Sequence, residues 1–221
     1  MANLFPHILG RVCTHPCESA CRRGKIDEPV SICSLKRVAA DFAKKEYPKR
    51  DLSKKKTGKK KKVAIIGAGP SGLAAGNDLA VMGHDITIFE ALPMAGGMLS
   101  VGIPPYRLPW NKIDGAVDWV EKLGINLKLK SPINSLAKFD KLVEKHDAVY
   151  IAAGAHKSMA LEIPGEDLKG VVHGITYMKD INLGKQKKVP SRVAVVGGGF
   201  TAIDCARSSL RLGAKEVFII Y

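Results

Sequence analysis

A glycine-rich turn between an apolar run and an alanine-rich stretch is the feature that most constrains the fold of this chain. The apolar run at residues 63–66 (VAII) is typical of a buried parallel strand, and the turn at 67–72 reads GAGPSG. We expect a helix over 73–82 and a second strand over 84–90. Strand, glycine turn, helix and strand in this order predict a Rossmann-like α/β fold that binds a dinucleotide.

The residue types in this turn have distinct physical roles. Gly67 permits the tight turn, Gly69 lets the backbone approach a pyrophosphate, and Gly72 allows close helix–strand packing. The N-terminus of the helix then faces the phosphates. Glu90 lies roughly 20 residues beyond the motif, where an acid can accept hydrogen bonds from an adenosine ribose.

A second unit of the same kind occupies residues 193–221, with the turn GGGFTA at 197–202. Ala202 stands where the third glycine would be, which the pattern allows. Two such units imply two nucleotides. Between them, residues 147–154 predict a further buried strand, whose end at Gly154 can approach a bound cofactor.

Four cysteines near the N-terminus form the pattern C-x3-C-x3-C-x11-C: Cys13, Cys17, Cys21 and Cys33. In a chain without a secretory signal, bunched thiolates indicate a metal centre rather than disulfides, because soft sulfur ligands select iron–sulfur clusters, zinc or copper(I). Three evenly spaced cysteines plus a remote one favour a [4Fe–4S] cluster over the paired knuckles of a zinc site. Zinc, unligated thiols and ligation by His15 are the alternatives.

A helix and a basic segment separate the cysteines from the first nucleotide unit. Residues 34–43 have apolar side chains at helical spacing, with Ser34 as the expected N-cap. Much of the net charge of +14 lies in residues 49–62, where no aromatic residues are interleaved to stack on bases. This segment predicts a solvated linker and argues against nucleic-acid binding, and it leaves docking of an acidic electron-transfer partner open.

The chain has no long apolar stretch and no signal-peptide pattern at its start. We therefore expect no membrane span and a reducing, cytoplasmic compartment. On the helix after the second glycine turn, Cys205 is expected to be a small packed residue. Asp204, beside it, is interpreted equally well as a neighbour of the nucleotide or as an ordinary helix position.

Several motifs in the same order resemble one family. The stretch at 96–109 (GGMLSVGIPPYRLP), the strand ending at Gly154, the turn at 197–202 and the N-terminal cysteines resemble the small (β) subunit of NADPH-dependent glutamate synthase. The flavin half of dihydropyrimidine dehydrogenase contains a similar module. The likeness covers essentially the whole chain. It implies that the first nucleotide unit binds FAD, that the second binds NAD(P)H, and that electrons pass from the pyridine nucleotide through FAD to iron–sulfur clusters.

The resemblance also implies binding residues. Around FAD it places Gly67, Gly69, Pro70, Ser71 and Gly72 at the pyrophosphate, Glu90 at the ribose, and Gly97, Met98 and Leu99 near the flavin. Around NAD(P)H it places Gly198, Gly199, Thr201 and Ala202. Arg107 matches an FAD-contacting arginine of the family, where a fixed cation suits the pyrophosphate charge. A surface arginine on a proline-rich loop is the alternative interpretation.

Three departures from the family matter. This chain lacks the additional cysteine-rich segment of members with two N-terminal clusters, so one cluster is expected. It has Leu9 where the family's C-G-R-V-C motif has its first cysteine, so Cys33 becomes the natural fourth ligand. The family also continues past the position of Tyr221, so we expect a fragment or a short subunit completed by a partner; the residues that choose NADPH or NADH would lie beyond it.

The resulting prediction is an α/β iron–sulfur flavoprotein: a helical [4Fe–4S] domain at 1–48, a basic linker at 49–62, an FAD-binding domain at 63–190, and the start of an inserted NAD(P)-binding domain at 191–221. It would transfer hydride from NAD(P)H to FAD and then single electrons to the cluster, with no catalytic side chain. Expected partners are other subunits of a redox complex, such as a large subunit or a ferredoxin-like protein. The alternatives are a non-catalytic electron-relay or structural subunit and a zinc-stabilised nucleotide-binding protein.

Overall fold

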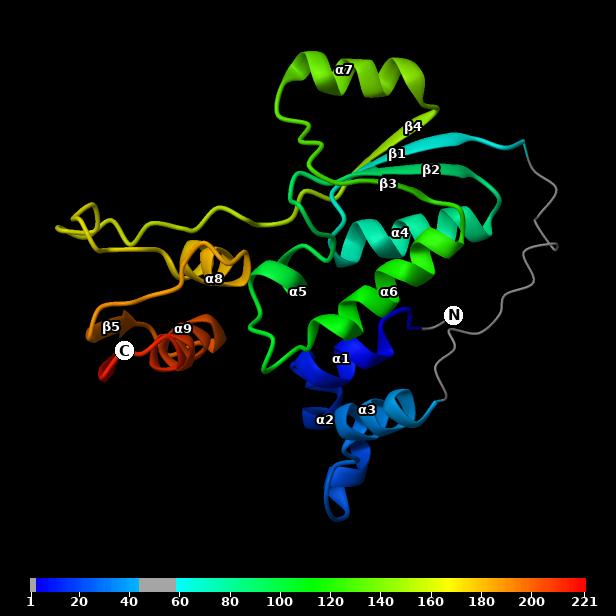
Figure 1. The fold of residues 1–221 in the computed structure, drawn as a ribbon. Helices are drawn as coiled ribbons and strands as arrows, with labels where there is room; N and C mark the ends of the chain where they lie inside the picture. Colours follow the sequence, from blue (N-terminus) through cyan, green and yellow to red (C-terminus); the bar gives the residue numbers. More distant parts are fainter. Residues whose placement is uncertain (1–2, 44–58) are drawn as a thin grey trace.

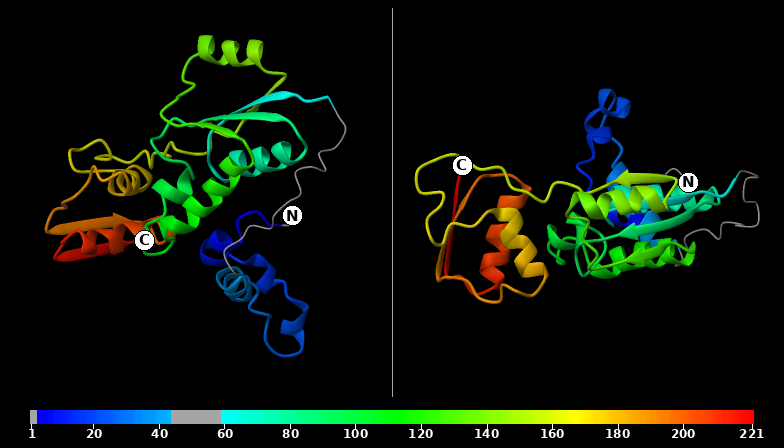
Figure 2. Two further views of the ribbon diagram at one scale, coloured as in Figure 1. Left: turned by 45° about the vertical axis from the view of Figure 1, so that its right-hand side comes forward. Right: turned by 90° about the horizontal axis from the view of Figure 1, so that it is seen from above.

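The computed structural model describes residues 3–43 and 59–221 as a helical N-terminal part and two α/β parts (Figure 1). Most of the predicted basic linker lies outside the described residues, and residues 59–61 lead directly into the first strand. Two further views show the N-terminal helices and the C-terminal α/β part on different sides of the larger α/β part (Figure 2). The structure confirms the predicted α/β class with a helical N-terminal part.

Four short helical elements form the N-terminal part: α1 (Pro6–Val12), α2 (Pro16–Ser19), the 3-10 turn η1 (Arg22–Lys25) and α3 (Ile32–Phe42). Helices α1 and α3 pack closely, because a Cβ atom at Gly10 would lie only 2.7 Å from the Cα atom of Arg37. The expected cap at Ser34 was wrong: α3 begins earlier, and Ser31 precedes it. The start lies three residues earlier than expected, and the apolar spacing does not fix a helix boundary to within one turn.

The larger α/β part is built on a parallel sheet in the order β3-β2-β1-β4. Its strands are β1 (Lys62–Ile66), β2 (Asp85–Phe89), β3 (Asn126–Lys128) and β4 (Ala148–Ile151). Helices α4 (Pro70–Val81) and α6 (Trp110–Lys122) cover one face, and α7 (Leu136–Lys145) lies on the other (Figure 1). The short helix α5 (Met98–Val101) follows the loop after β2. The predicted strand, glycine turn, helix and strand are therefore confirmed.

One buried hydrophobic cluster joins the N-terminal helices to the larger α/β part. Ile65 and Ile88 lie fully buried at the centre of the sheet, with Val120 of α6 in the same cluster. Phe5 and Ile8, at the start and in the middle of the N-terminal helix α1, belong to this cluster too. The N-terminal helices are therefore packed onto the α/β core rather than held only by the intervening segment.

The smaller α/β part has two parallel strands, β5 (Arg192–Val196) and β6 (Glu216–Ile220), with α9 (Phe200–Arg211) between them in sequence. Helix α8 (Gly174–Asn182) precedes this unit and packs between α9 and α5. The second predicted nucleotide unit is thus formed as a strand, turn, helix and strand. No helix among the described residues is long and apolar enough to cross a membrane.

Candidate functional site

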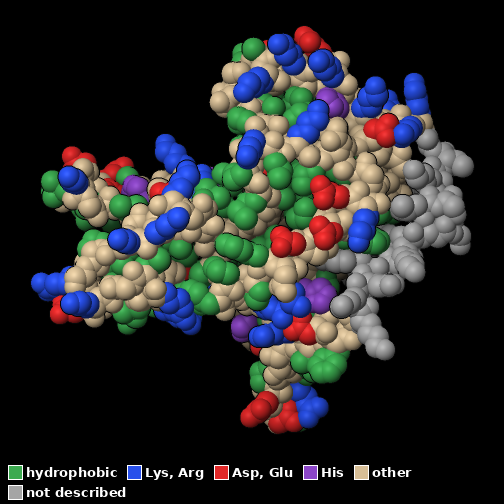
Figure 3. Space-filling view, in the orientation of Figure 1, with side chains coloured by type: hydrophobic (Ala, Val, Ile, Leu, Met, Phe, Trp, Pro, Cys, Tyr) green, Lys and Arg blue, Asp and Glu red, His purple; other side chains and the backbone are tan. Residues whose placement is uncertain are grey.

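A cleft of about 610 Å³ opens where the strands of the larger sheet end. In open parallel sheets this carboxyl edge is where ligands bind. Most residues predicted to surround FAD line this cleft: Gly67, Gly69, Pro70, Ser71, Glu90, Gly97, Met98 and Gly154. On the face shown in Figure 3, apolar side chains gather between α7 and α5, which lie to either side of this edge. The structure therefore brings residues from four separate segments into one ligand-sized site.

The floor of the cleft is made of backbone, and its glycines have different reasons to be glycine. Gly67 has φ +107°, and a Cβ atom there would lie 2.3 Å from the carbonyl oxygen of Ala152. Gly97 has φ +55°, and its Cβ atom would lie 2.9 Å from the Cα atom of Gly69. Gly69 itself has ordinary backbone angles and room for a Cβ atom, whose nearest neighbour would be 3.8 Å away. Packing within the protein therefore does not require glycine at position 69. A side chain there would instead take up space in the cleft that a ligand could use.

Helix α4 points its N-terminus at this floor. Gly69 is its N-cap residue and Pro70 its first residue, and no side chain among the described residues caps it. The first N–H groups of a helix need partners from outside the helix, and they carry partial positive charge. An uncapped helix start on a glycine floor fits the pyrophosphate of a dinucleotide.

Glu90 is the buried acid of the cleft, with 6% of its surface exposed. Its Oε2 atom accepts the N–H of Ala68 at 2.7 Å, and its Oε1 atom accepts the N–H of Leu92 at 2.8 Å. A carboxylate has about four acceptor positions, so roughly two remain for a ligand. Glu90 is therefore held in place by the backbone and can still accept hydrogen bonds from ribose hydroxyl groups.

Two predicted FAD residues lie behind the cleft rather than on its surface. Gly72 packs against the turn, where a Cβ atom would lie 1.9 Å from the carbonyl oxygen of Gly67. Leu99 packs on the hydrophobic cluster. Their contribution in this structure is to shape the cleft, and the residues that line it fit FAD.

Arg107 lies away from the cleft, in the loop before α6. Its guanidinium donates to the Oδ2 atom of Asp204 on α9 at 2.5 Å, and it lies 5.4 Å from the centre of the Phe200 ring. Burial raises the pKa of Asp204, although the nearby guanidinium acts in the opposite direction. The Oδ1 atom of Asp204 is buried without a hydrogen-bond partner in the described part of the chain. Arg107 therefore contacts the second nucleotide unit and does not line the cleft, and its contact with FAD stays a prediction.

The neighbouring Tyr106 was not singled out by the sequence motifs. Its hydroxyl lies 3.4 Å from both the carbonyl oxygen of Asp204 and the Oγ atom of Ser208. The guanidinium carbons of Arg207 and Arg211 lie 4.7 Å and 3.9 Å from the centre of its ring. Two arginines one helical turn apart can both lie over one aromatic ring, but nothing in the sequence indicates which aromatic residue they contact.

The second glycine turn stands at the carboxyl end of β5. Gly199 is the N-cap residue of α9, with no side-chain cap among the described residues, as in the first unit. Gly198, Gly199 and Thr201 are exposed and Ala202 is partly buried. These four predicted NAD(P)H residues lie on one turn, outside the cleft that holds the predicted FAD residues.

The four N-terminal cysteines are distributed over the helical part. Cys17 is exposed and the other three are partly buried, and all are free thiols. Within residues 3–43 and 59–221, no three cysteine, histidine or acidic side chains are grouped so as to hold a single metal ion. Backbone N–H groups of Val30, Arg23 and Gly24 lower the pKa of the Cys21 thiol. The donor chemistry, four free thiols in one helical part, fits an iron–sulfur cluster.

Cys33 is the cysteine whose surroundings are most informative. Its Sγ atom donates to the carbonyl oxygen of Leu9 at 3.5 Å, and its N–H donates to the Oε1 atom of Glu18 at 2.7 Å. The first turn of α3 therefore lies beside both α1 and α2. Cys33 reaches the backbone at position 9, where the resembling family has a cysteine and this chain does not.

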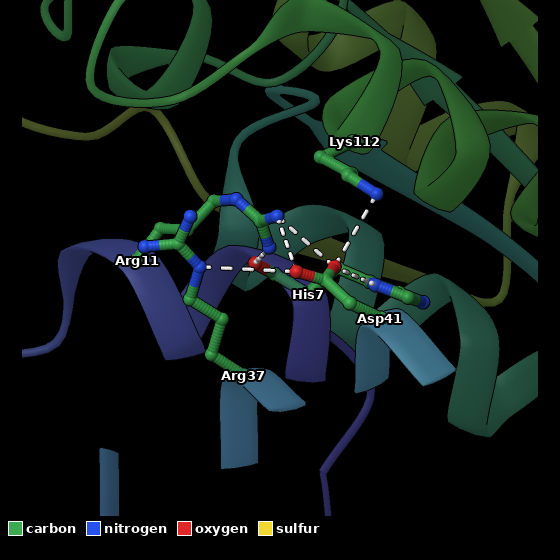
Figure 4. Close-up of polar contacts among 5 residues, drawn as sticks. All are labelled: His7, Arg11, Arg37, Asp41 and Lys112. Carbon is green, nitrogen blue, oxygen red and sulfur yellow. Dashed lines mark hydrogen bonds and ion pairs between the residues drawn. The ribbon is translucent and has the colours of Figure 1, made fainter. Parts of the chain in front are cut away.

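Asp41 connects the helical part to the larger α/β part (Figure 4). Its carboxylate accepts from Arg11 at 2.7 Å and lies 3.4 Å from His7, 3.8 Å from Arg37 and 3.4 Å from Lys112. The hydrogen bond from Arg11, followed by the other nearby basic groups, holds the pKa of Asp41 well below its usual range. Helices α1, α3 and α6 thus meet at one carboxylate.

Comparison with known families confirms the predicted combination of domains. Residues 61–221 match the pyridine nucleotide-disulphide oxidoreductase family model. Residues 1–47 match the model of dihydropyrimidine dehydrogenase domain II, described as a 4Fe-4S cluster domain. These matches confirm the expected cofactor set of FAD, NAD(P) and a [4Fe–4S] cluster.

Curated relatives include redox subunits. The chain is 44% identical to the NADP(+)-dependent formate dehydrogenase subunit beta of Moorella thermoacetica, over 97% of this chain and 34% of the relative. It is 42% identical to the NADPH-Fe(3+) oxidoreductase subunit beta of Geobacter sulfurreducens, over 98% and 33%. The glutamate synthase [NADPH] small chain of Bacillus subtilis is 36% identical, over 97% and 45%. The chain therefore spans between a third and a half of these relatives, and the predicted resemblance to the glutamate synthase small chain is confirmed.

Solved structures share the fold. A complex of 2-naphthoyl-CoA reductase has a TM-score of 0.62 and 33% identity, covering 73% of this chain and 23% of that one. FprA from Mycobacterium tuberculosis, in complex with NADPH, has a TM-score of 0.60 and 26% identity, covering 72% and 43%. Both support the oxidoreductase fold seen here.

Proposed function

The chain belongs to the pyridine nucleotide-disulphide oxidoreductase family, and we propose that it moves electrons between NAD(P)H, FAD and a [4Fe–4S] cluster. The observation that carries this proposal is the cleft itself, with a glycine floor, an uncapped helix start and a backbone-held acid at one edge of a parallel sheet. When bound, FAD supplies hydride acceptance and one-electron release. The protein's part is to hold the cofactors in place.

Within the cleft, we assign the turn at 67–72 and the start of α4 to the pyrophosphate of FAD. Glu90 holds the ribose, because its two backbone hydrogen bonds fix a carboxylate that keeps free acceptor positions. Gly97, Met98 and Gly154 also line the cleft, and we assign them to the flavin. Gly198, Gly199, Thr201 and Ala202 hold the NAD(P)H phosphates at the second turn.

For the cluster, we assign Cys13, Cys17, Cys21 and Cys33 as ligands. Cys33 replaces the cysteine absent at Leu9, and its side chain already contacts the backbone there. Backbone N–H groups directed at Cys21 favour its thiolate form, which is the form that binds iron.

The domain boundaries we propose are 1–48 for the cluster, 49–62 for the basic segment, 63–190 for FAD and 191–221 for the start of the NAD(P)H unit. Two contacts dock the cluster unit onto the FAD unit. Phe5 and Ile8 lie in the shared hydrophobic core, and Asp41 pairs with the basic side chains around it, including Lys112 of α6. This docking fixes the position of the cluster unit relative to the FAD unit, so electron transfer between the two cofactors would need no large domain motion.

Partner and compartment follow from related observations. The relatives named above are beta subunits or a small chain, and we propose that this chain likewise works with a second subunit that takes its electrons. We place it in a cytoplasmic, reducing compartment, since all five cysteines are free thiols. This setting also suits a [4Fe–4S] cluster.

The test is anaerobic addition of NADPH or NADH to protein reconstituted with FAD, iron and sulfide. We expect the flavin absorbance to bleach, followed by the electron paramagnetic resonance signal of a reduced cluster. A flavin that never bleaches while dithionite still reduces the cluster would favour the electron-relay subunit. Zinc without a visible chromophore would favour the zinc-stabilised nucleotide-binding protein.

A further inference from the structure

Arg107, the side chain predicted to place a positive charge beside FAD, does not line the cleft. Arg107 is paired with Asp204 and lies outside the cleft. Among the described residues that line the cleft, Lys179 is the one with a permanent positive charge. It comes from α8, a helix that packs against α9 of the second nucleotide unit and carries no recognised motif.

Helix α8 is firmly held, so the position of Lys179 is well defined. Met178 is fully buried, and the side-chain amide of Asn182 donates to the carbonyl oxygen of Ile103 at 3.1 Å. The hydroxyl groups of Tyr177 and Ser209 lie 2.8 Å apart, which ties α8 to α9. Lys179 is only partly exposed, and its ammonium group makes no hydrogen bond or ion pair with the described residues.

The topology of the sheet indicates which half of a dinucleotide Lys179 would face. Glu90 directly follows β2 and the glycine turn follows β1, so a bound ribose and pyrophosphate would lie at these two strand ends. On the other side of β1 lies β4, whose end at residues 151–154 lines the cleft together with Lys179. A dinucleotide running from Glu90 across the turn must therefore place its far half, the flavin, over the end of β4.

We propose that Lys179 faces the flavin half of bound FAD and raises its reduction potential. This inference rests on the proposed function, because it requires FAD in the cleft. A cation beside the ring favours the reduced flavin, which carries more negative charge than the oxidised one, and a partly enclosed site strengthens this effect. Lys179 acts on the flavin through its charge, and it transfers neither a proton nor an electron.

The test compares Lys179→Met with Lys179→Arg, which keeps the charge, and with Lys185→Met as the matched control. Lys185 is an exposed lysine just beyond the same helix and does not line the cleft. Three quantities are measured: FAD affinity, ADP affinity and the flavin reduction potential. We expect Lys179→Met to weaken FAD binding about ten-fold, to leave ADP binding within about two-fold, and to shift the potential to more negative values.

Lys179→Arg should keep the potential near that of the wild type, and Lys185→Met should change none of the three quantities. An unchanged FAD affinity and potential in Lys179→Met, with wild-type thermal unfolding, would overturn the role of Lys179 and leave the proposed function intact. Equal losses of ADP and FAD affinity would place the charge at the pyrophosphate and overturn the flavin assignment. Failure of the wild-type protein to bind FAD would overturn the proposed function itself.

Discussion

Arg107 donates a hydrogen bond to Asp204 across 2.5 Å and so joins the larger α/β part to helix α9 of the second nucleotide unit. The Asp204 side chain is 5% exposed, so this ion pair is largely removed from water. Next to this pair, Arg207 and Arg211 of the same helix make cation–π contacts with the Tyr106 ring. The loop before α6 therefore orients the second nucleotide unit relative to the first.

Breaking this pair should destabilise the chain. Arg107→Met leaves the Asp204 carboxylate buried without its cation, and we expect the free energy of unfolding to fall by about 2–4 kcal/mol. Urea unfolding at neutral pH measures the change. Arg192→Met is the matched control, because the Arg192–Glu216 pair is 74% and 55% exposed and should contribute less than about 1 kcal/mol. Equal effects of the two substitutions would show that the buried pair does not stabilise the interface.

Asp41 should make stability depend on pH. Its basic neighbours lower its folded-state pKa below the unfolded value of about 3.9, so its contribution is complete above about pH 5 and is lost as pH falls. In the cluster-free chain we expect Asp41→Asn to cost about 1–3 kcal/mol at pH 7 and much less near pH 2. Asp118→Asn, an exposed acid on α6, is the control. A deficit that does not shrink on acidification would contradict this role.

Glu90 should control FAD affinity without affecting the cluster. Glu90→Ala removes charge-assisted hydrogen bonds of about 1.5–3 kcal/mol, or one to two decades in affinity. Glu90→Gln keeps one side-chain oxygen and so an acceptor for one of the two backbone N–H groups, and thermal unfolding of both variants separates loss of ligand binding from loss of folding. FAD titration of the apo-protein gives the affinities, with Glu121→Ala as an exposed control. Equal FAD affinity in all variants would show that Glu90 does not contact FAD and serves only to hold the loop backbone.

Two glycines of the cleft floor should respond differently to alanine. In Gly67→Ala the added Cβ atom would clash with a carbonyl oxygen, and alanine disfavours this positive φ. We therefore expect the free energy of unfolding to fall by about 1–3 kcal/mol or more. Gly69→Ala has room within the protein, so its stability should stay near the wild type while FAD affinity drops about ten-fold or more. Thermal unfolding and FAD titration test both variants. Normal FAD binding by a folded Gly69→Ala protein would argue that no ligand approaches that backbone.

Cys33 should be needed for the cluster. Replacing it by serine removes a soft ligand, so we expect markedly less iron and a weaker visible charge-transfer band after anaerobic reconstitution. Cys205→Ser is the matched control, because Cys205 is buried on α9, far along the chain from the cluster unit, and burial raises its pKa to about 11. Unchanged iron content in Cys33→Ser would remove Cys33 from the ligand set.

Local patterns in the sequence were enough to predict β1, β2, β4, β5 and β6, the two glycine turns and the helices that follow them. The three-residue strand β3 was not predicted, and β4 was expected to be buried but is mostly exposed. In those segments the structural requirement lies within a few residues: a tight turn, an apolar run and a helix start with free N–H groups. The same locality explains why Glu90 was found, since the acid ends the strand that follows the first helix. The start of α3 was missed because a helix boundary depends on neighbours that a periodic pattern does not include.

Only the tertiary structure decided how distant side chains pair. Asp41 pairs with Lys112 of α6, Arg107 pairs with Asp204 and does not line the cleft, and Lys179 reaches the cleft from α8, which packs against the second unit. Arg107 and Asp204 are 97 positions apart, and a charged side chain of either could have paired with many others. Which partner each side chain finds depends on how the two α/β parts pack together. That packing is determined by the burial of many apolar residues at once, so no single residue in the sequence reveals it.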